Sequence, residues 1–439
     1  MIDTALQREE RQAAEWFGQP PGLAILFLTD MWEQFSYYGM RVLLVYYMVK
    51  QLQFSQGHAS LVFGAYTAFV FLTPIAGGVI CDRWLGRRTC VVLGSLIMAL
   101  GHFMLASESL FYVALATIGV GNGLFLPSLP SQVGELYRRD DPRRGNAYNY
   151  YYVGANLGSF LAPFGVGTVG EIYGWHWGFA LAGVGMLLGL GIYLVGGRHL
   201  PAESPQPGQG VPPLPESGLG QDIADGAISL RRRLLLLGAV GVGAIVFRIA
   251  YGQAGNTLPL WIEHVDRRIG SFVIPMTWIQ ALNPLFVFAF TPWIVSRWLR
   301  LARHSREPSA LRKMATGAGG LCVAYLMLAG VDVWGEIHHT TSGWGWLVAF
   351  FAVMTAGELY ILPIGLGLFG SLAPAGLEAT SIALWFLAAF GGNLGAGVLG
   401  TLWSRLTPAE FFVLTAAVSA LAGLMLLSLD RPVRREIPR

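Results

Sequence analysis

The stretch PPGLAILFLTDMWEQFSYYGMRVLLVYYMVK, residues 20–50, is apolar for most of its length but carries Asp30, Glu33 and Arg41. A helix of about 20 mostly apolar residues is long enough to cross the hydrocarbon core of a bilayer. Ionisable side chains inside such a helix are costly, and they usually face a watery cavity or pair with one another. The stretch therefore predicts a membrane-spanning helix with a functional polar face.

The rest of the chain has the same apolar character. Hydrophobic residues make up 54% of the 439 residues and charged residues only 13%, with a mean hydropathy of +0.52. Soluble domains carry about 25% charged residues. Twelve stretches are long and apolar enough to span a membrane, near residues 21–50, 58–80, 89–107, 110–137, 146–170, 176–197, 232–262, 271–296, 312–332, 344–370, 379–404 and 409–429. The predicted fold class is an all-α membrane protein with twelve transmembrane helices.

A segment rich in Pro, Gly and Ser, which begins HLPAESPQPGQG at residue 199, divides these spans six and six. Its composition cannot build a core, so we predict a flexible linker. The predicted organisation is a cytoplasmic N-terminal segment (1–20), an N-terminal six-helix bundle (21–198), a cytoplasmic linker (199–230), a C-terminal six-helix bundle (231–430) and a cytoplasmic tail (431–439).

The two halves resemble each other at matching positions. GNGLFLP (121–127) aligns with GELYILP (357–363), and NLGSF at Asn156 aligns in the same register with NLGAG at Asn393. A parallel repeat of six-helix bundles is typical of two-lobed transporters, whose substrate site lies between the lobes near the membrane midplane.

Positive charge is distributed unevenly between the loops. Most of the 29 Lys and Arg residues lie in alternate loops and at the chain ends, and only Lys50, Arg267, Arg268 and Arg405 lie in the opposite loops. Cytoplasmic loops carry the excess of Lys and Arg. We therefore predict a multi-pass protein of the cell membrane with both termini in the cytoplasm.

Two motifs resemble those of known transporters. GGVICDRWLGRR (77–88) resembles the loop motif of the major facilitator superfamily, and DMWEQFSYYGMR (30–41) resembles the ExxERFxYYGMR motif of its proton-dependent oligopeptide transporter family. Further stretches, such as YYVGANLGSFLAP (151–163) and GELYILPIGL (357–366), extend the resemblance over most of residues 20–430. It implies import of di- or tripeptides or peptide-like compounds by alternating access, coupled to proton symport.

The first span places its polar side chains on one face. Asp30, Glu33, Tyr37 and Arg41 follow helical spacing. Proton-coupling candidates are Asp30 and Glu33, with Glu358 as a further one. The alternative interpretation of these charges is a static buried ion pair that holds helices together, although such pairs contribute little net stability.

The predicted substrate-binding residues combine charge, amide groups and aromatic rings: Gln34, Tyr37, Tyr38, Arg41, Phe71, Asn156, Arg248, Asn283, Glu358 and Trp385. The resemblance implies that Glu358 contacts the amino terminus of a peptide. Asn156 and Asn283 can hydrogen-bond a peptide backbone. The aromatic residues either line side-chain pockets or pack in the core.

The chain also departs from the family pattern. The family's first glutamate is Asp30, and its arginine is Gln34. The fourth-span lysine is Leu126, a second-span tyrosine is Phe71, and the seventh-span glutamate is Gly252. Arg248 stands where the family usually has an aromatic residue. We expect Arg248 to replace lost positive charge, towards a substrate carboxylate or towards Asp30, Glu33 or Glu358; snorkelling to the membrane surface or a fixed ion pair is the alternative.

The missing ionisable residues keep other modes of action open. A proton-uncoupled facilitator or an exporter of a specialised substrate is one alternative, and a non-transporting membrane receptor is another. Enzyme motifs such as HExxH or a phosphate-binding loop are absent from the sequence, so we predict no enzyme, cofactor, metal or nucleic-acid partner. The expected partners are a small peptide, protons and the lipid bilayer, with the monomer as the functional unit. The three cysteines suggest no disulfide framework.

Overall fold

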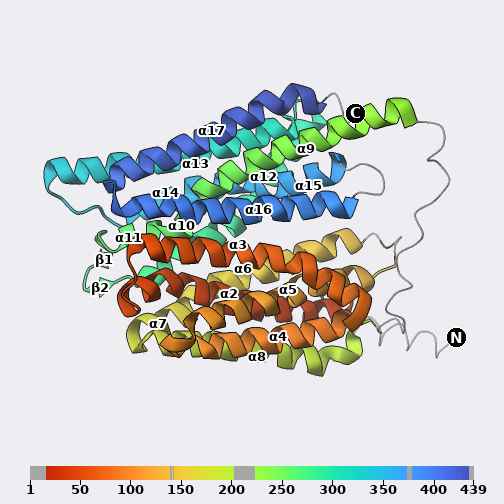
Figure 1. The fold of residues 1–439 in the computed structure, drawn as a ribbon, viewed down its shortest axis with the longest axis horizontal. Helices are drawn as coiled ribbons and strands as arrows, with labels where there is room; N and C mark the ends of the chain where they lie inside the picture. Colours follow the sequence, from red (N-terminus) through yellow and green to blue (C-terminus); the bar gives the residue numbers. More distant parts are fainter. Residues whose placement is uncertain (1–15, 139–140, 142, 202–222, 373–377, 435–439) are drawn as a thin grey trace. The chain divides into compact units, whose positions relative to one another are not determined.

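The computed structural model describes residues 16–138, 141, 143–201, 223–372 and 378–434. Most of the predicted N-terminal segment (1–20) and linker (199–230), and the end of the predicted tail (431–439), lie outside these residues. The described part is almost wholly helical (Figure 1). This confirms the predicted all-α class.

The elements of the first half are α2 (Pro21–Tyr46), η1 (Tyr47–Gln51), α3 (Gln56–Ile80), η2 (Cys81–Leu85), α4 (Arg87–Met104), η3 (Glu108–Leu110), α5 (Phe111–Glu135), α6 (Arg144–Ala162), η4 (Pro163–Gly167), α7 (Thr168–Tyr173), α8 (Trp175–Val195) and η5 (Gly196–His199). The η elements are short 3-10 or π-helical turns that mostly extend an α-helix. All six predicted spans of this half are therefore helical.

The elements of the second half are α9 (Ile223–Tyr251), α10 (Gln253–Asn256), α11 (Leu258–Ile262), β1 (Arg268–Ile269), β2 (Phe272–Val273), η6 (Met276–Ala281), α12 (Leu282–Arg303), α13 (Ala310–His338), α14 (Gly345–Leu359), α15 (Leu362–Leu372), α16 (Glu378–Gly400), η7 (Thr401–Ser404) and α17 (Pro408–Arg434). In Figure 1, α13 and α17 run side by side along most of their length, and α9 also packs on α17.

Nine helical segments within the described residues are long and apolar enough to cross a membrane. The helices α2, α4 and α6 are not among them, although each coincides with a predicted span. In α2 the reason is the group Asp30, Glu33 and Arg41, which lowers the mean hydropathy of any window that contains it. The predicted site lies on this polar face of α2, the same face that lowers the hydropathy of the helix.

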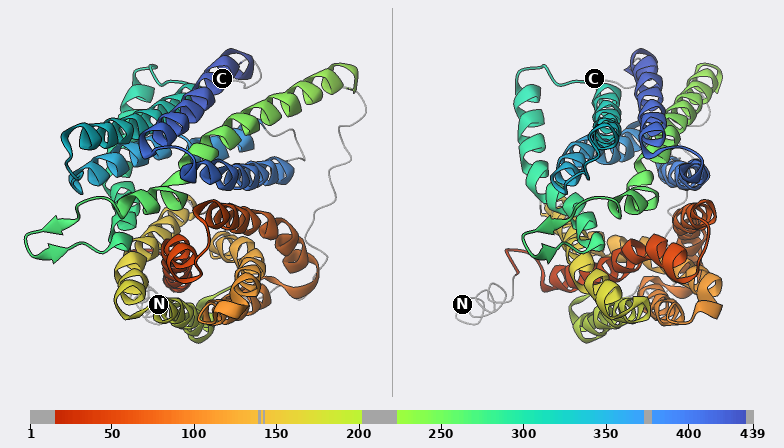
Figure 2. Two further views of the ribbon diagram at one scale, coloured as in Figure 1. Left: turned by 60° about the vertical axis from the view of Figure 1, so that its left-hand side comes forward. Right: turned by 90° about the vertical axis from the view of Figure 1, so that its left-hand side faces the viewer.

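Three predicted spans of the second half differ from the observed helices, and one of them, 344–370, is interrupted at Tyr360 between α14 and α15. The span predicted at 271–296 begins with a β-hairpin and becomes helical only at Met276, because Gly270 adopts a positive φ of 61° that turns the chain. The hairpin pairs Arg268 with Val273 in antiparallel register, and Figure 2 shows it standing away from the neighbouring helices. The span predicted at 232–262 is also interrupted, at Gly252 and again at Thr257.

Contacts between Cα atoms divide the chain into two compact units. Residues 1–43 and 73–210 form unit 1, and residues 44–72 and 211–439 form unit 2. The sequence suggested a division at the linker alone, whereas the contacts place residues 44–72 with the second half. Helix α3 passes from unit 2 to unit 1 between Leu72 and Thr73.

The internal repeat has a structural counterpart in each unit. In unit 1, a Cβ atom on Gly121 of α5 would lie 2.7 Å from the carbonyl oxygen of Gly94 on α4. In unit 2, a Cβ atom on Gly357 of α14 would lie 2.6 Å from the carbonyl oxygen of Gly317 on α13. Small residues let membrane helices approach closely. The aligned glycines 121 and 357 thus serve the same purpose in their own bundles.

The loop between α3 and α4 contains a disulfide that the sequence did not suggest. Cys81 and Cys90 are bonded, with 5.9 Å between their Cα atoms, and both are buried. The π-helical turn η2 and Gly86, at a φ of 77°, reverse the chain and bring the two cysteines together. The expectation that the cysteines form no disulfide was therefore wrong.

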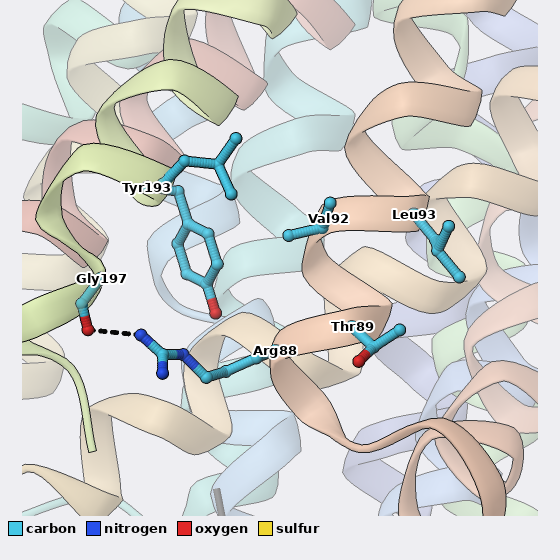
Figure 3. A pocket seen from close by; sticks show the side chains of 7 residues that line it. Arg88, Thr89, Val92, Leu93, Tyr193 and Gly197 are labelled. Atoms are coloured by element: carbon cyan, nitrogen blue, oxygen red, sulfur yellow. Dashed lines mark hydrogen bonds between the residues drawn. The ribbon is translucent and has the colours of Figure 1, made fainter. Parts of the chain in front are cut away.

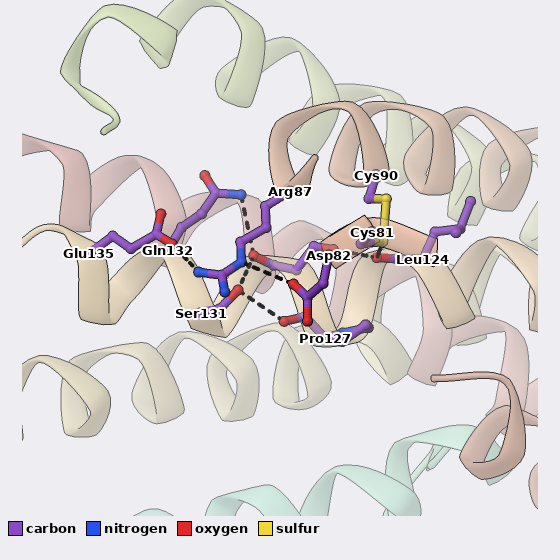
Figure 4. A network of polar contacts seen from close by, with 10 residues as sticks. Cys81, Asp82, Arg87, Cys90, Leu124, Pro127, Ser131, Gln132 and Glu135 are labelled. Atoms are coloured by element: carbon purple, nitrogen blue, oxygen red, sulfur yellow. Dashed lines mark hydrogen bonds and ion pairs between the residues drawn. A yellow bond between two sulfur atoms is a disulfide. The ribbon is translucent and has the colours of Figure 1, made fainter. Parts of the chain in front are cut away.

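Polar contacts fix the same loop to α5 (Figure 4). Arg87 forms ion pairs with Asp82 of the loop and with Glu135 at the end of α5. The Sγ of Cys81 lies 3.7 Å from the carbonyl oxygen of Leu124. Charge at this end of the bundle is thus paired and partly solvated.

Unit 2 contains a closely packed seam between residues 56–72 of α3 and α16. A Cβ atom on Gly64 would lie 2.4 Å from the Cα of Gly397. A Cβ atom on Gly400 would lie 2.8 Å from the Oγ of Ser60. At the end of the seam, Lys50 Nζ lies 3.4 Å from Glu263 Oε1, with 38% and 29% of the two side chains exposed.

Replacing Lys50 by Gln is expected to lower the free energy of unfolding by less than about 1 kcal/mol, because exposed ion pairs contribute little. The difference should vanish at high ionic strength, since salt screens solvated charges. Thermal unfolding in detergent at low and high salt measures it. A large loss that persists in high salt would show that this pair is not a solvated one.

Candidate functional site

The predicted site residues fall into two groups, one in each unit, and each group is described by itself. Unit 1 holds Asp30, Glu33, Gln34, Tyr37, Tyr38, Arg41 and Asn156. Unit 2 holds Phe71, Arg248, Asn283, Glu358 and Trp385.

In unit 1, two buried carboxyl groups are bound by neutral donors. Asp30 is 2% exposed and Glu33 is 1% exposed. The Tyr151 hydroxyl donates to Asp30 Oδ1 at 2.5 Å, and the Gln34 amide donates to Glu33 Oε2 at 2.8 Å. Within the described residues, neither carboxyl group forms an ion pair with Lys or Arg.

Glycines on two neighbouring helices bring these groups together. A Cβ atom on Gly158 of α6 would lie 2.0 Å from the carbonyl oxygen of Met31, and one on Gly154 would lie 2.9 Å from Phe27. On the other side of α2, a Cβ atom on Gly189 of α8 would lie 3.0 Å from Trp32. Helix α2 is therefore enclosed at close range, which removes water from its acidic residues.

The remaining unit 1 residues lie further along the same helices. The rings of Tyr37 and Tyr38 meet edge to face with 5.6 Å between centroids, and the Arg41 guanidinium lies 5.6 Å from the centre of the Tyr38 ring. The Asn156 side-chain amide donates to the Tyr152 carbonyl oxygen, one turn earlier in α6. The sequence prediction placed Asn156 towards a substrate, whereas here its amide donates within its own helix.

In unit 2, Glu358 and Asn283 are direct partners. The Asn283 amide nitrogen lies 2.6 Å from Glu358 Oε2 and 3.0 Å from the Thr355 hydroxyl. Glu358 is half-buried near the end of α14, and Asn283 begins α12. The amide donates to the carboxylate and holds it in place, and the negative charge oriented in this way suits a bound cation.

Arg248 lies between two aromatic rings of unit 2. Its guanidinium carbon is 5.3 Å from the centre of the Phe71 ring and 5.7 Å from that of Trp385. Trp385 in turn packs on Gly365, where a Cβ atom would lie 2.2 Å from the indole. Aromatic faces stabilise a cation and fix its direction. The guanidinium of the half-buried Arg248 is thus held against both rings within unit 2.

The presence of glycine at position 252 is explained by close packing against α16. A Cβ atom at this position would lie 2.7 Å from the Cβ of Ala396 on α16. Just beyond Gly252, Gln253 and Asn256 both donate to the carbonyl oxygen of Ala396, at 2.9 and 3.2 Å. The break between α9 and α10 is therefore fastened to α16, and glycine at 252 allows that approach.

A pocket between α4 and α8 of unit 1 lies apart from these groups (Figure 3). Arg88, Thr89, Val92, Tyr193 and Gly197 line it, and Arg88 donates to the carbonyl oxygen of Gly197. None of the predicted site residues contributes to its lining.

The sequence missed two residues of these groups. Tyr151 lies in the motif YYVGANLGSFLAP, but the sequence assigned no role to it. Thr355 lies in an apolar span, and nothing in its sequence surroundings indicated a functional role. Each contacts a predicted residue far away in the chain, Asp30 and Asn283 respectively. A buried tyrosine or threonine in a span with several glycines is the signal that could have suggested them.

Comparisons with known proteins identify the family to which this chain belongs. A family model described as the POT family matches residues 88–211 and 224–414. The di-/tripeptide transporter of Lactococcus lactis subsp. cremoris is 30% identical over 98% of each chain. An uncharacterized transporter of Bacillus subtilis, YclF, is 31% identical over 96% of this chain and 95% of its own.

Solved structures agree with the sequence relatives. Peptide transporter POT in complex with sulfate superposes with a TM-score of 0.86 at 27% identity, over 98% of this chain and 99% of that chain. A mutant of peptide transporter POT in complex with alafosfalin gives a TM-score of 0.83 with the same identity and coverage. The fold is thus the major facilitator fold predicted from the sequence, and the chain belongs to the POT family, the oligopeptide transporter family that its first-span motif resembles.

Proposed function

We propose that the protein is a secondary transporter that imports di- or tripeptides or peptide-like compounds by alternating access. The observation that carries this proposal is the pair of opposite charges held in unit 2. Glu358 is oriented by Asn283 and suits a peptide ammonium group, and Arg248 is oriented by Phe71 and Trp385 and suits a carboxylate. The names of its di-/tripeptide-transporting relatives support the same substrate class.

Proton symport is the energy source that fits the buried carboxyl groups of α2. Asp30 and Glu33 are enclosed and bound by neutral donors, so both are candidates for carrying the proton. Tyr37, Tyr38 and Arg41 lie further along the same helix, and the Asn156 amide must leave the Tyr152 carbonyl oxygen before it can bind a substrate. We further propose a monomer in the cell membrane with both termini in the cytoplasm, from the distribution of Lys and Arg.

The proposal is tested in proteoliposomes with labelled dialanine. Uptake against the concentration gradient is expected when an inward proton gradient is applied, together with counterflow when it is not. Absence of both signals would contradict a peptide substrate. Counterflow without accumulation would instead establish the second candidate, a proton-uncoupled facilitator.

One observation favours the second candidate, the proton-uncoupled facilitator. The described part of unit 1 offers Asp30 and Glu33 no Lys or Arg partner, and the family pattern supplies such partners where this chain has Gln34 and Leu126. A carboxyl group that never releases its proton would carry no net proton. Accumulation driven by the gradient decides between the two.

Arg248 gives a test of the substrate carboxylate. Replacing Arg248 by Lys is expected to raise KM for dialanine about tenfold, because lysine lacks the planar fork that binds a carboxylate in two places. The variant should transport dialanine amide, which has no carboxylate, with nearly unchanged KM. Uptake rates at graded concentrations of the two compounds measure this. An equal rise in KM for both would show that Arg248 does not contact the carboxylate.

A further inference from the structure

Asp30 presents its two oxygen atoms to different surroundings. Oδ1 accepts the hydrogen bond from Tyr151 at 2.5 Å. Oδ2 is buried and has no hydrogen-bond partner within the described residues. One oxygen is therefore occupied, and the other is the atom that can bind a proton.

Among the described residues, the ionisable groups that interact with Asp30 are Glu33 and Tyr151. Glu33 lies one turn further along α2 and interacts with Asp30 electrostatically. Tyr151 faces Asp30 from α6. From α8, Gly189 packs on Trp32, and Tyr193 lies in the same core cluster as Leu26 but donates its hydroxyl to Gln132. Tyr37 and Arg41 interact with each other further along α2.

Two enclosed carboxyl groups without a cation resist being ionised together, because like charges repel in a medium of low polarity. The donors decide which of them ionises first. A phenol hydroxyl is a stronger hydrogen-bond donor than a carboxamide, so the Tyr151 contact stabilises an ionised carboxylate more than the Gln34 contact does. Asp30 is thus the acid that loses its proton, while Glu33 keeps its own.

We propose that Tyr151 is a positioning residue for proton coupling: its hydroxyl binds Oδ1 of Asp30 and leaves Oδ2 as the atom that takes up and releases the transported proton. The inference rests on the proposed proton symport. It gives this chain a neutral hydroxyl partner for its coupling acid instead of a cation.

The test compares Tyr151→Phe with Tyr150→Phe in proteoliposomes. Both substitutions remove a single hydroxyl from neighbouring positions of α6, but the Tyr150 ring packs on Trp16, away from Asp30. Uptake of dialanine driven by a proton gradient is measured over a range of external pH, and counterflow is measured without a gradient.

For Tyr151→Phe, Asp30 loses a donor that favours its ionised form, so it stays protonated to higher pH. The alkaline limb of the uptake profile should move upwards by about one pH unit, the size expected for a hydrogen bond to a charged group. Counterflow should be retained, and Tyr150→Phe should follow the wild-type profile. In an Asp30→Asn background, the further change Tyr151→Phe should move nothing.

Each contrary result has a definite meaning. A profile of Tyr151→Phe that matches Tyr150→Phe would overturn the role of Tyr151 but not proton symport. Loss of counterflow in Tyr151→Phe alone would make the hydroxyl a packing requirement and would also overturn the proposal. A wild-type protein whose accumulation is independent of pH would overturn proton symport itself, and the proposal with it.

Discussion

Replacing Glu358 by Gln is expected to lower kcat/KM for dialanine uptake about 100-fold. Removing one partner of a desolvated charge pair costs roughly 2–5 kcal/mol, and each 1.4 kcal/mol corresponds to about a factor of ten. Glutamine keeps the shape and can still accept from the Asn283 amide. The loss would therefore report the missing charge rather than a collapsed site.

Two comparisons sharpen this result. Glu336 is an exposed acid near the end of α13, and Glu336→Gln should leave uptake unchanged. N-acetyl-dialanine has no ammonium group, so the wild-type protein and Glu358→Gln should bind it equally poorly in a competition assay. If Glu358→Gln discriminated against the acetylated peptide as strongly as the wild-type protein does, another group would have to bind the amino terminus.

Replacing Gly64 by Leu is expected to reduce transport by more than about 100-fold while the protein still folds. The new Cβ atom would lie 2.4 Å from the Cα and 2.7 Å from the nitrogen of Gly397, and these are backbone atoms that no rotamer change can move. Overpacking of this kind typically costs about 1–3 kcal/mol. We expect the seam between α3 and α16 to open and close during alternating access, so a bulky residue here should keep it from closing.

The state of the seam can be measured directly. Ser60 is 1% exposed in the closed seam. With Cys322 replaced by Ser, a Ser60→Cys variant should react slowly with a membrane-impermeant maleimide, and Ser60→Cys combined with Gly64→Leu should react faster. Gly319→Leu, at a position with open space around it, is the matched control. Normal transport by Gly64→Leu would show that the seam does not move during transport.

Much of the fold could be predicted from hydropathy and from the internal repeat. Most membrane-spanning helices are long and apolar, so most of the spans can be located from hydropathy, although α2, α4 and α6 are less apolar than the others. The alignment of Gly121 with Gly357 also corresponds to a shared structural role, since each packs on a glycine of the preceding helix. Interruptions were harder to predict: the breaks at Gly252 and Tyr360 lie in apolar runs that look continuous in sequence.

The residues of the site could be predicted from the sequence, but the contacts between them could not. Glu358 and Asn283 were both identified, yet their hydrogen bond joins two helices that are far apart in the chain. The bond between Tyr151 and Asp30 depends on how closely Gly154 and Gly158 let α6 approach α2. Such distances follow from packing, which no local pattern in the sequence encodes.

The contact between Gly252 and Ala396 also bears on how this chain diverged from its relatives. The family pattern has an acid at position 252, but a Cβ atom there would now lie 2.7 Å from the Ala396 methyl group. Restoring the acid alone would clash, whereas Ala396→Gly followed by Gly252→Glu would not meet that methyl group. The residues at positions 252 and 396 are therefore coupled, because a side chain at 252 requires a smaller residue at 396.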